Sequence, residues 1–430
     1  MPRRRSLGTR KFYAPMKVTS IQTFLCQAYR TNWVFVKVTT DGGLHGVGEA
    51  TLEMREPTVA QACRELERYL VGRDPHDIEA FWHDAYRDAY WRGGPVLMSA
   101  LAGVEMALWD IKGKALGVPV WQLLGGKVRD RVPCYANGWF APAVRPDEFA
   151  EKAKAAVAQG FRGLKWDPFG SAYMNIGKRE LRRALDCIAA VASAVGPEVD
   201  ILVEGHGRFN VPTAVRIAHA LEDFDVTWFE EPIPPDDPEA LAEIKRRVKV
   251  PIAGGERLYS RWDYRNYLRL GCADFIQPDV SHAGGIGEVR KIAAMAEAHH
   301  IPVCPHNPSG PVANAATLQI AACAPNFFLL ETMASDVTHR RDVSTETVRF
   351  EDGCMHIPTA PGLGIDICEE AIAKHPYEPR DLRHYTGALT QIRPPDATSY
   401  FNTQEQARGH KADNPGPRAK KSAPRRRAES

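Results

Sequence analysis

Six ionisable residues follow short apolar runs at a nearly constant spacing in the second half of the chain. Successive members lie 26, 26, 23, 27 and 25 residues apart, which is about the length of one strand and one helix. Because catalytic groups of parallel barrels lie at the C-terminal ends of the strands, this spacing predicts that the six side chains converge on one rim. They are Glu204, Glu230, Glu256, Asp279, His306 and Glu331.

Three of these residues, Glu204, Glu230 and Glu256, end successive predicted strands, so their carboxylates can meet at one point. Gathering ionised groups there is costly unless a cation pairs with them. Ligands that are all oxygen select a hard cation, and three carboxylates with room for water or substrate suit magnesium. One such glutamate alone is more often a surface side chain or a helix cap. Glu231 is the alternative to Glu230 as a ligand.

Asp279 and His306 end neighbouring predicted strands and form a candidate acid–base pair. A carboxylate bonded to an imidazole fixes its tautomer and makes it a stronger base. A lone histidine at a strand end is more often packed or exposed, but the neighbouring aspartate favours a catalytic dyad.

Three further histidine positions have weaker patterns. His206 lies two residues after Glu204 and is predicted to face the same rim, as a catalytic acid or as an ordinary turn residue. His282 and the pair His299–His300 have no such constellation and are expected at the surface.

The elements that must position these groups begin near residue 131. Short β-branched or aromatic runs alternate with helical patterns up to residue 369, which predicts a parallel barrel. No glycine-rich dinucleotide fingerprint follows a strand, and this disfavours an open doubly wound sheet. The predicted strands are VPCYA, FRGLKW, DILVEG, VTWFEE, PIAGGE, ADFIQP, IPVCPH and FFLLE.

Residues 16–130 have a different pattern, which predicts a separate α+β region. IQTFLC and WVFVKVTT alternate as strands do, and the DGG that follows is typical of a turn. PTVAQACRELERYLVG and MSALAGVEMALWDIKGKALG have helical spacing of their apolar residues.

Composition and charge narrow the class of protein. The 430 residues carry a net charge of +2, and residues 1–15 and 396–430 are basic while the body is acidic. The acidic body argues against nucleic acid as a partner, and the 396–430 tail is expected to be disordered. The nine cysteines form no Cys-x-x-Cys pair, and neither a signal peptide nor a membrane span is expected. We therefore expect a cytoplasmic protein without a membrane partner.

Several long segments resemble the enolase superfamily, within its mandelate racemase subgroup, and most closely the galactonate-dehydratase-like sugar-acid dehydratases. The resemblance covers about residues 16–380. The segments that carry it are RGGPVLMSALAGVEMALWDIKGKALGVPVWQLLGG, EGHGRF, FEEP, GGERLYSR, QPDVSHAGGIGEVRKIA and PHNPSGP.

The resemblance implies an α/β fold, a modified (β/α)7β TIM-like barrel over residues 131–369. An α+β capping domain over 16–130 would be completed by residues 370–395. It also implies one magnesium ion per subunit on the three glutamates, and a homo-oligomer. For catalysis it implies His306 and Asp279 as the base, His206 as the acid, and Glu331 as a hydrogen-bond donor to the enolate oxygen.

Two positions depart from the subgroup. Glu204 stands where the first metal ligand is normally Asp, so the ion or the strand end must shift slightly. Racemases of the subgroup have Lys-x-Lys at the end of the second strand, and here the pair is Lys165 and Asp167. A base on only one face of the α-carbon fits dehydration better than racemisation. Both residues are predicted to contact the substrate.

The predicted activity is magnesium-dependent dehydration of a sugar acid, either an aldonate such as galactonate or an aldarate. The proton α to the carboxylate leaves, the β-hydroxyl is eliminated, and a 2-keto-3-deoxy acid results. In the cap, Arg55 and Trp91 are predicted to bind substrate. The alternatives are a racemase, epimerase or lactone cycloisomerase of the same superfamily, or a non-catalytic barrel with a binding or structural role.

Overall fold

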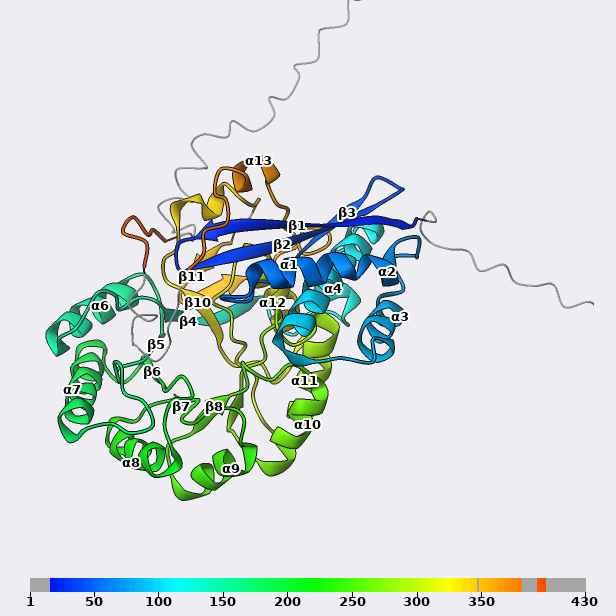
Figure 1. Ribbon diagram of the computed structural model, residues 1–430. Helices are drawn as coiled ribbons and strands as arrows, with labels where there is room; N and C mark the ends of the chain where they lie inside the picture. Colours follow the sequence, from blue (N-terminus) through cyan, green and yellow to red (C-terminus); the bar gives the residue numbers. More distant parts are fainter. Residues whose placement is uncertain (1–15, 346–347, 381–392, 400–430) are drawn as a thin grey trace, which may run out of the picture.

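The computed structural model describes residues 16–345, 348–380 and 393–399. Its N-terminal part is an antiparallel sheet with helices on one side, drawn in blue across the upper end of the barrel in Figure 1. The strands are β1 (Val18–Ala28), β2 (Thr31–Thr40) and β3 (His45–Glu49). The helical elements are α1 (Glu56–Glu65), α2 (Glu67–Leu70), α3 (Ile78–His83), the π-helical turn η1 (Asp84–Asp88), α4 (Gly94–Leu116) and α5 (Val120–Leu123).

Helix α4 is the core helix of this cap. By length and composition alone it could cross a membrane, but 72% of its most apolar stretch is buried inside the protein. It packs directly on β3, where a Cβ atom on Gly48 would lie 1.9 Å from the carbonyl oxygen of Gly103. Glycine at position 48 is therefore what allows the helix to approach the sheet so closely.

The barrel strands pair in parallel in chain order from β4 to β9, and β10 pairs with β4. Between β9 and β10 a single residue, Val303, occupies the seventh position and bridges Ile276 and Phe327. The ring is thereby closed. The strands are β4 (Arg131–Asn137), β5 (Gly163–Trp166), β6 (Asp200–Glu204), β7 (Trp228–Glu230), β8 (Ile252–Gly254), β9 (Phe275–Ile276) and β10 (Leu330–Met333).

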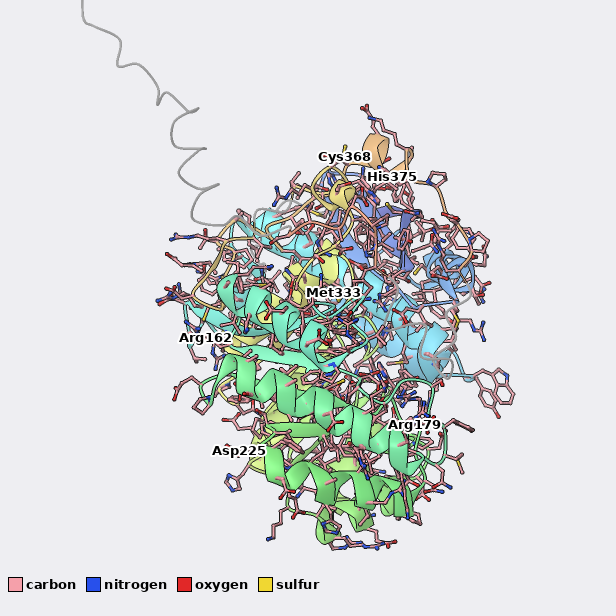
Figure 2. The ribbon with its side chains drawn as sticks, turned by 90° about the vertical axis from the view of Figure 1, so that its left-hand side faces the viewer. Arg162, Arg179, Asp225, Met333, Cys368 and His375 are labelled. Atoms are coloured by element: carbon pink, nitrogen blue, oxygen red, sulfur yellow. The ribbon has the colours of Figure 1, made fainter. Side chains whose placement is uncertain are left out.

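A helix follows each of the first seven barrel positions, which confirms the predicted (β/α)7β architecture with an α+β cap. In Figure 2, Arg162 and Asp225 mark the entry to β5 and β7 at one end of the barrel, and Arg179 in α7 lies at the other. The helices are α6 (Pro146–Ala158), α7 (Lys178–Val195), α8 (Val211–Leu221) with η2 (Glu222–Phe224), α9 (Pro238–Arg247), α10 (Arg261–Leu270), α11 (Ile286–Ala298) and α12 (Pro311–Cys323).

After the barrel the chain returns to the cap. Gln27 N in β1 donates to His375 O over 2.9 Å, and Glu378 N donates to Asn32 Oδ1 over 3.0 Å. Thr398 then pairs with Asp336 beside the end of β10. The predicted arm at 1–15, residues 381–392 of the predicted cap segment and residues 400–430 lie outside the described residues. The remaining elements are η3 (Thr338–Arg341), β11 (Phe350–Glu351), β12 (Cys354–His356) and α13 (Glu369–Ile372).

A buried carboxylate at the end of β3 joins the cap to helix α12. Glu49 accepts backbone hydrogen bonds from Gly310, Val312 and Ala313 over 2.7, 3.1 and 2.9 Å. The first amides of a helix have no partner within it and carry partial positive charge, so a carboxylate there stabilises the helix end.

A second carboxylate, on α4, does the same for helix α11. Glu105 accepts from Ile286 N and Gly287 N, both over 2.8 Å, and from the Trp109 indole over 2.7 Å. Its side chain is buried, and burial raises its pKa to about 7 in spite of these hydrogen bonds. The cap therefore contributes the N-terminal capping groups of two barrel helices.

Candidate active site

Three glutamates meet at the rim that faces the cap. Glu204 and Glu230 are the last residues of β6 and β7 and pair in register, and Glu256 follows β8 by two residues. One oxygen atom from each lies within 4.8 Å of the others. Burial, followed by the charge of Glu204, raises the pKa of Glu230 to about 8. The pKa of Glu256 is raised to about 7 by burial and by the charge of Glu231.

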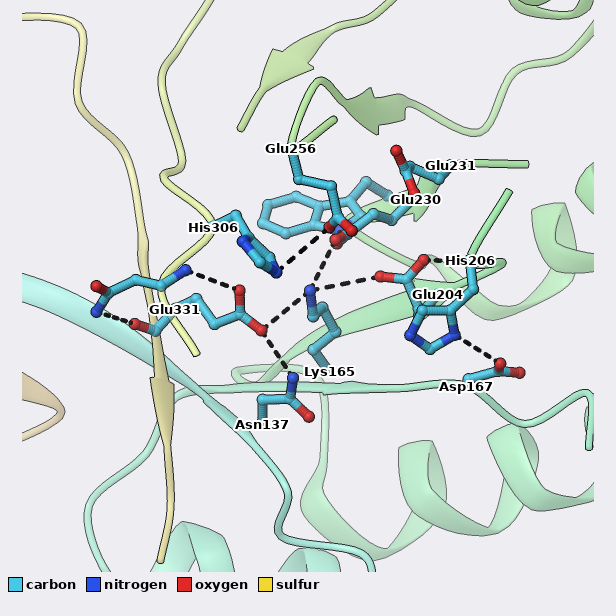
Figure 3. A network of polar contacts seen from close by, with 12 residues as sticks. Asn137, Lys165, Asp167, Glu204, His206, Glu230, Glu231, Glu256, His306 and Glu331 are labelled. Atoms are coloured by element: carbon cyan, nitrogen blue, oxygen red, sulfur yellow. Dashed lines mark hydrogen bonds and ion pairs between the residues drawn. The ribbon is translucent and has the colours of Figure 1, made fainter. Parts of the chain in front are cut away.

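The ammonium group of Lys165 lies among these carboxylates (Figure 3). Its Nζ atom is 2.7 Å from Glu230 Oε1, 3.0 Å from Glu331 Oε1 and 3.4 Å from Glu204 Oε2. Burial would lower the pKa of Lys165, but the charges of Glu230 and Glu331 outweigh it and raise the pKa well above its usual value. Lys165 is thus a fixed positive charge at the centre of the site.

Asp279 and His306 form the predicted dyad. His306 Nδ1 lies 2.7 Å from Asp279 Oδ2, and Asp279 Oδ1 accepts from Ser281 N over 2.6 Å. His306 Nε2, the other ring nitrogen, lies 3.7 Å from Glu256 Oε2. Burial opposes charging of the ring, but Glu256 and Asp279 outweigh it and raise the pKa of His306 to about 10.

His206 has a matching aspartate that the sequence did not indicate as its partner. Its Nδ1 lies 2.8 Å from Asp167 Oδ2, and Arg208 Nη2 donates to the same oxygen over 2.5 Å. Asp167 Oδ1 accepts from Phe169 N over 2.8 Å, so both of its oxygens are occupied. Although burial opposes it, the charges of Glu204 and Asp167 raise the pKa of His206 to about 9. The structure therefore places Asp167 against His206, and its contact with a substrate stays a prediction.

Glu331 in β10 is an acceptor in this structure. It accepts from Asn137 Nδ2 over 2.7 Å and from Asn307 N over 3.1 Å. Burial would raise the pKa of Glu331, but Lys165 and then His306 outweigh it and lower the pKa to about 2. In this arrangement Glu331 accepts hydrogen bonds, and its donation to an enolate oxygen stays a prediction.

A cavity of about 310 Å³ lies between these groups and the cap. Of the two cap residues predicted to bind substrate, Arg55 lines it. Trp91 is 81% exposed and is not among the described residues that line the cavity.

His282 also lines the cavity, although we expected it at the surface. Its Nδ1 is 3.0 Å from Ser99 Oγ in α4, and its Nε2 is 3.7 Å from Asp279 Oδ2. Its position three residues after Asp279, in the turn that begins α11, is the only sequence feature that could have indicated this role.

Family models match most of the chain. Residues 9–125 match the N-terminal domain of mandelate racemase / muconate lactonizing enzyme, and residues 148–371 match the enolase C-terminal domain-like model.

Curated relatives match over most of their length. D-gluconate dehydratase of Thermoproteus tenax is 40% identical over 351 residues, which is 81% of this chain and 71% of that protein. D-galactonate dehydratase of Ralstonia pickettii (strain 12J) is 39% identical over 377 residues, 86% of this chain and 97% of that protein.

Solved structures give the same picture. A member of the enolase superfamily from Salmonella Typhimurium superposes with a TM-score of 0.81 at 31% identity, over 84% of this chain and 98% of that one. A mandelate racemase/muconate lactonizing enzyme-like protein from Roseovarius sp. TM1035 superposes with a TM-score of 0.80 at 32% identity, over 84% and 96%.

Proposed function

The chain belongs to the mandelate racemase / muconate lactonizing enzyme family of the enolase superfamily, and on this premise we propose that it is a sugar-acid dehydratase. It is then a carbon–oxygen lyase that removes the proton α to a carboxylate and eliminates the β-hydroxyl, giving a 2-keto-3-deoxy acid. The similarity to D-gluconate and D-galactonate dehydratases supports this activity. The observation that carries it is a pair of His–Asp dyads on opposite sides of the carboxylate cluster.

The residues of the cluster fit a magnesium ion. Glu204, Glu230 and Glu256 offer only oxygen ligands, and Glu204 Oε2 is buried without a hydrogen-bond partner. Oxygen ligands in a partly open site suit magnesium, and we infer one ion per subunit held by these three residues. When bound, the ion would compensate the glutamate charges and stabilise the negative charge that develops on the substrate carboxylate.

His306 is positioned to remove the α-proton. Its Nδ1 is held by Asp279, so Nε2 is the atom that would accept the proton. The charge of Glu256 is the first that raises the pKa of His306, so a cation held by Glu256 would lower that pKa and leave Nε2 able to act as a base. Asp279 then stabilises the imidazolium. Lys165, at the centre of the carboxylates, is positioned to contact the substrate carboxylate.

His206 is positioned to protonate the leaving hydroxyl. It lies on the opposite side of Lys165 from His306 (Figure 3), and its Nδ1 is held by Asp167. Elimination needs a base at the α-carbon and an acid at the β-oxygen, and the two dyads supply one each. Asp167, bonded to His206 and Arg208, does not provide the second base that a racemase needs.

A screen of the purified protein tests this proposal. The protein is incubated with magnesium and a panel of aldonates and aldarates, and 2-keto-3-deoxy acids are measured. We expect turnover of at least one sugar acid, its loss with EDTA, and its loss in Glu230→Gln. Absence of product across the panel, with folded protein, would contradict the proposal and favour a cycloisomerase or a non-catalytic barrel. The cytoplasmic location and the homo-oligomer remain predictions.

A further inference from the structure

His282 completes a second cluster of metal-ligand atoms beside the three glutamates. Asp279, His282 and His306 each offer one such atom, and these atoms lie within 4.8 Å of one another. Asp279 and His306 are the dyad of the proposed reaction, but His282 has no part in it. The position of His282 beside the dyad is therefore not explained by catalysis.

The distances in this cluster suit a tetrahedral ion. His306 Nδ1 lies 2.7 Å from Asp279 Oδ2, and His282 Nε2 lies 3.7 Å from the same oxygen. Ligand atoms bonded to a tetrahedral zinc ion at about 2.0–2.2 Å stand roughly 3.3 Å apart, and the two distances lie on either side of that value. Side-chain shifts of about half an ångström would therefore bring both nitrogens to the right distance from the oxygen.

The remaining polar atom of each side chain already has a partner on its far side. His282 Nδ1 lies 3.0 Å from Ser99 Oγ in α4, and Asp279 Oδ1 accepts a backbone hydrogen bond over 2.6 Å. His306 Nε2 lies 3.7 Å from Glu256 Oε2, so a proton on that nitrogen faces a carboxylate. Partners of this kind orient the ligands of metal sites. The three side chains are thus held in the orientation that an ion needs.

Two imidazoles and one carboxylate select a different ion from three carboxylates. Imidazole suits zinc and other transition-metal ions, whereas magnesium takes oxygen ligands. Three protein ligands leave the fourth position of a tetrahedral ion open. His282 and His306 both line the cavity, so water from the cavity can fill that position.

We propose that Asp279, His282 and His306 form an inhibitory site for a transition-metal ion such as zinc. When the ion binds Nδ1 of neutral His306, the ring proton moves from Nδ1 to Nε2 and no proton is lost. Nε2 then has no lone pair with which to accept the α-proton, so the base is blocked. Removal of the ion restores the tautomer that Asp279 holds. The inhibition rests on the proposed dehydratase activity, whereas the binding of the ion does not.

Calorimetric titration of the magnesium-saturated protein with zinc tests the site. We expect one zinc ion per chain in addition to magnesium. Ser99→Ala removes only the hydrogen bond to a ligand and should weaken zinc binding about 10–100-fold, and His282→Asn should weaken it further. His299→Asn is the matched control, because His299 is an exposed histidine at the end of α11, and there the affinity should not change. Glu230→Gln should retain the zinc site.

Zinc should also stop exchange of the α-proton, and excess magnesium should not restore it. Absence of zinc binding, or an affinity unchanged in His282→Asn and Ser99→Ala, would overturn the inference. Displacement of zinc by magnesium, or its loss in Glu230→Gln, would overturn it too, because the ion would then lie on the glutamates. Exchange that persists in the zinc-bound protein would overturn the inhibition.

The calorimetry needs no substrate, so failure of this inference and failure of the proposed function are distinguishable. A zinc site in a protein that turns over no sugar acid would leave the site standing and remove the dehydratase. Turnover without a zinc site would do the reverse. If His282→Asn does not fold, Ser99→Ala against His299→Asn carries the same comparison.

Discussion

His306 and His206 are held in the same way on the two sides of the site. In each, the Nδ1 nitrogen lies within 2.8 Å of a buried aspartate, Asp279 or Asp167. The second dyad differs because Arg208 shares its aspartate. In the proposed reaction, the two proton transfers therefore belong to two different residues.

Replacing each histidine should separate the two proton transfers. His306→Asn removes the base, and we expect exchange of the α-proton with solvent to fall by about 10²–10⁴-fold. His206→Asn removes the acid and should retain that exchange while dehydration is lost. Deuterium incorporation from D₂O, followed by NMR, measures the first step, and formation of the keto acid measures the second. Exchange retained in His306→Asn would remove His306 as the base.

Asp167→Asn should weaken the acid without affecting the base. An amide holds the His206 imidazole less strongly and does not stabilise its charged form, so we expect kcat to fall about 10–100-fold. KM and α-proton exchange should change much less. Since Arg208 loses its buried partner, unfolding should also become easier, and kinetics must be measured well below the melting temperature. An equal loss of exchange and dehydration would instead indicate general damage to the site.

The sequence predicted some of these residues better than others. The three glutamates could be placed because the strand–helix repeat fixes where each strand ends. The partnership of Asp167 with His206 could not, because it joins the ends of two strands whose loops differ in length. The ion pair of Glu331 with Lys165 joins two strands that are far apart in sequence, so the spacing of residues along the chain does not indicate it.

At the level of the elements, the N-terminus of helix α11 contacts the buried carboxylate of Glu105, whose ionisation costs free energy in the folded protein. Burial holds the pKa of Glu105 at about 7 in the folded protein, above its ordinary value of 4.5. Between these two values the folded state binds more protons than the unfolded state. The contribution of Glu105 to the free energy of unfolding is therefore complete at low pH. It falls by roughly 3 kcal/mol as the pH rises through these two values.

Glu105→Gln should remove this part of the pH dependence. The amide is neutral at every pH, so the free energy of unfolding should fall less between pH 5 and pH 8 than in the wild type. Chemical denaturation at several pH values measures the slope. Glu243→Gln is the matched control, because Glu243 makes an exposed ion pair with Arg247 on α9 and should leave the slope unchanged. Equal slopes in the wild type and in Glu105→Gln would refute this role.

The sequence predicted the type of each helix or strand more reliably than its length. The seventh predicted strand, IPVCPH, is a single bridging residue at Val303, and β9 has two residues. Buried strands in a closed barrel can be this short because the flanking helices carry most of the packing. Trp91 is exposed in the described structure. The sequence could not indicate this, because an aromatic residue in a loop has no periodicity that shows which way its side chain faces.

For the whole molecule, metal binding should appear as stability. A ligand that binds only the folded state adds about 2.7 kcal/mol at 100 times its Kd. Magnesium should therefore raise the melting temperature by several degrees, and Glu230→Gln should abolish most of that rise. Glu239→Gln, an exposed glutamate at the start of α9, is the control and should respond as the wild type does. A rise that persists in Glu230→Gln would place the ion elsewhere.

The two-part organisation was predictable from the change in pattern near residue 131, but the way the parts join was not. Glu49 ends β3 of the cap, and its side chain is buried against the start of α12. Such contacts link residues more than 250 positions apart, and nothing in a local pattern indicates them.

The buried carboxylates of Glu49 and Glu105, which connect the cap to the barrel helices, limit which caps can be combined with this barrel. A cap transplanted from a relative onto this barrel would have to bring acids at the positions of Glu49 and Glu105. Without them the buried starts of α12 and α11 would lose their acceptors. The turn between β1 and β2 lines the cavity through Arg30, and among the described contacts it gives no carboxylate to the start of a barrel helix. A short loop of this kind can therefore be exchanged where a whole cap cannot. New specificities in this scaffold should therefore arise by grafting loops, with the cap inherited intact.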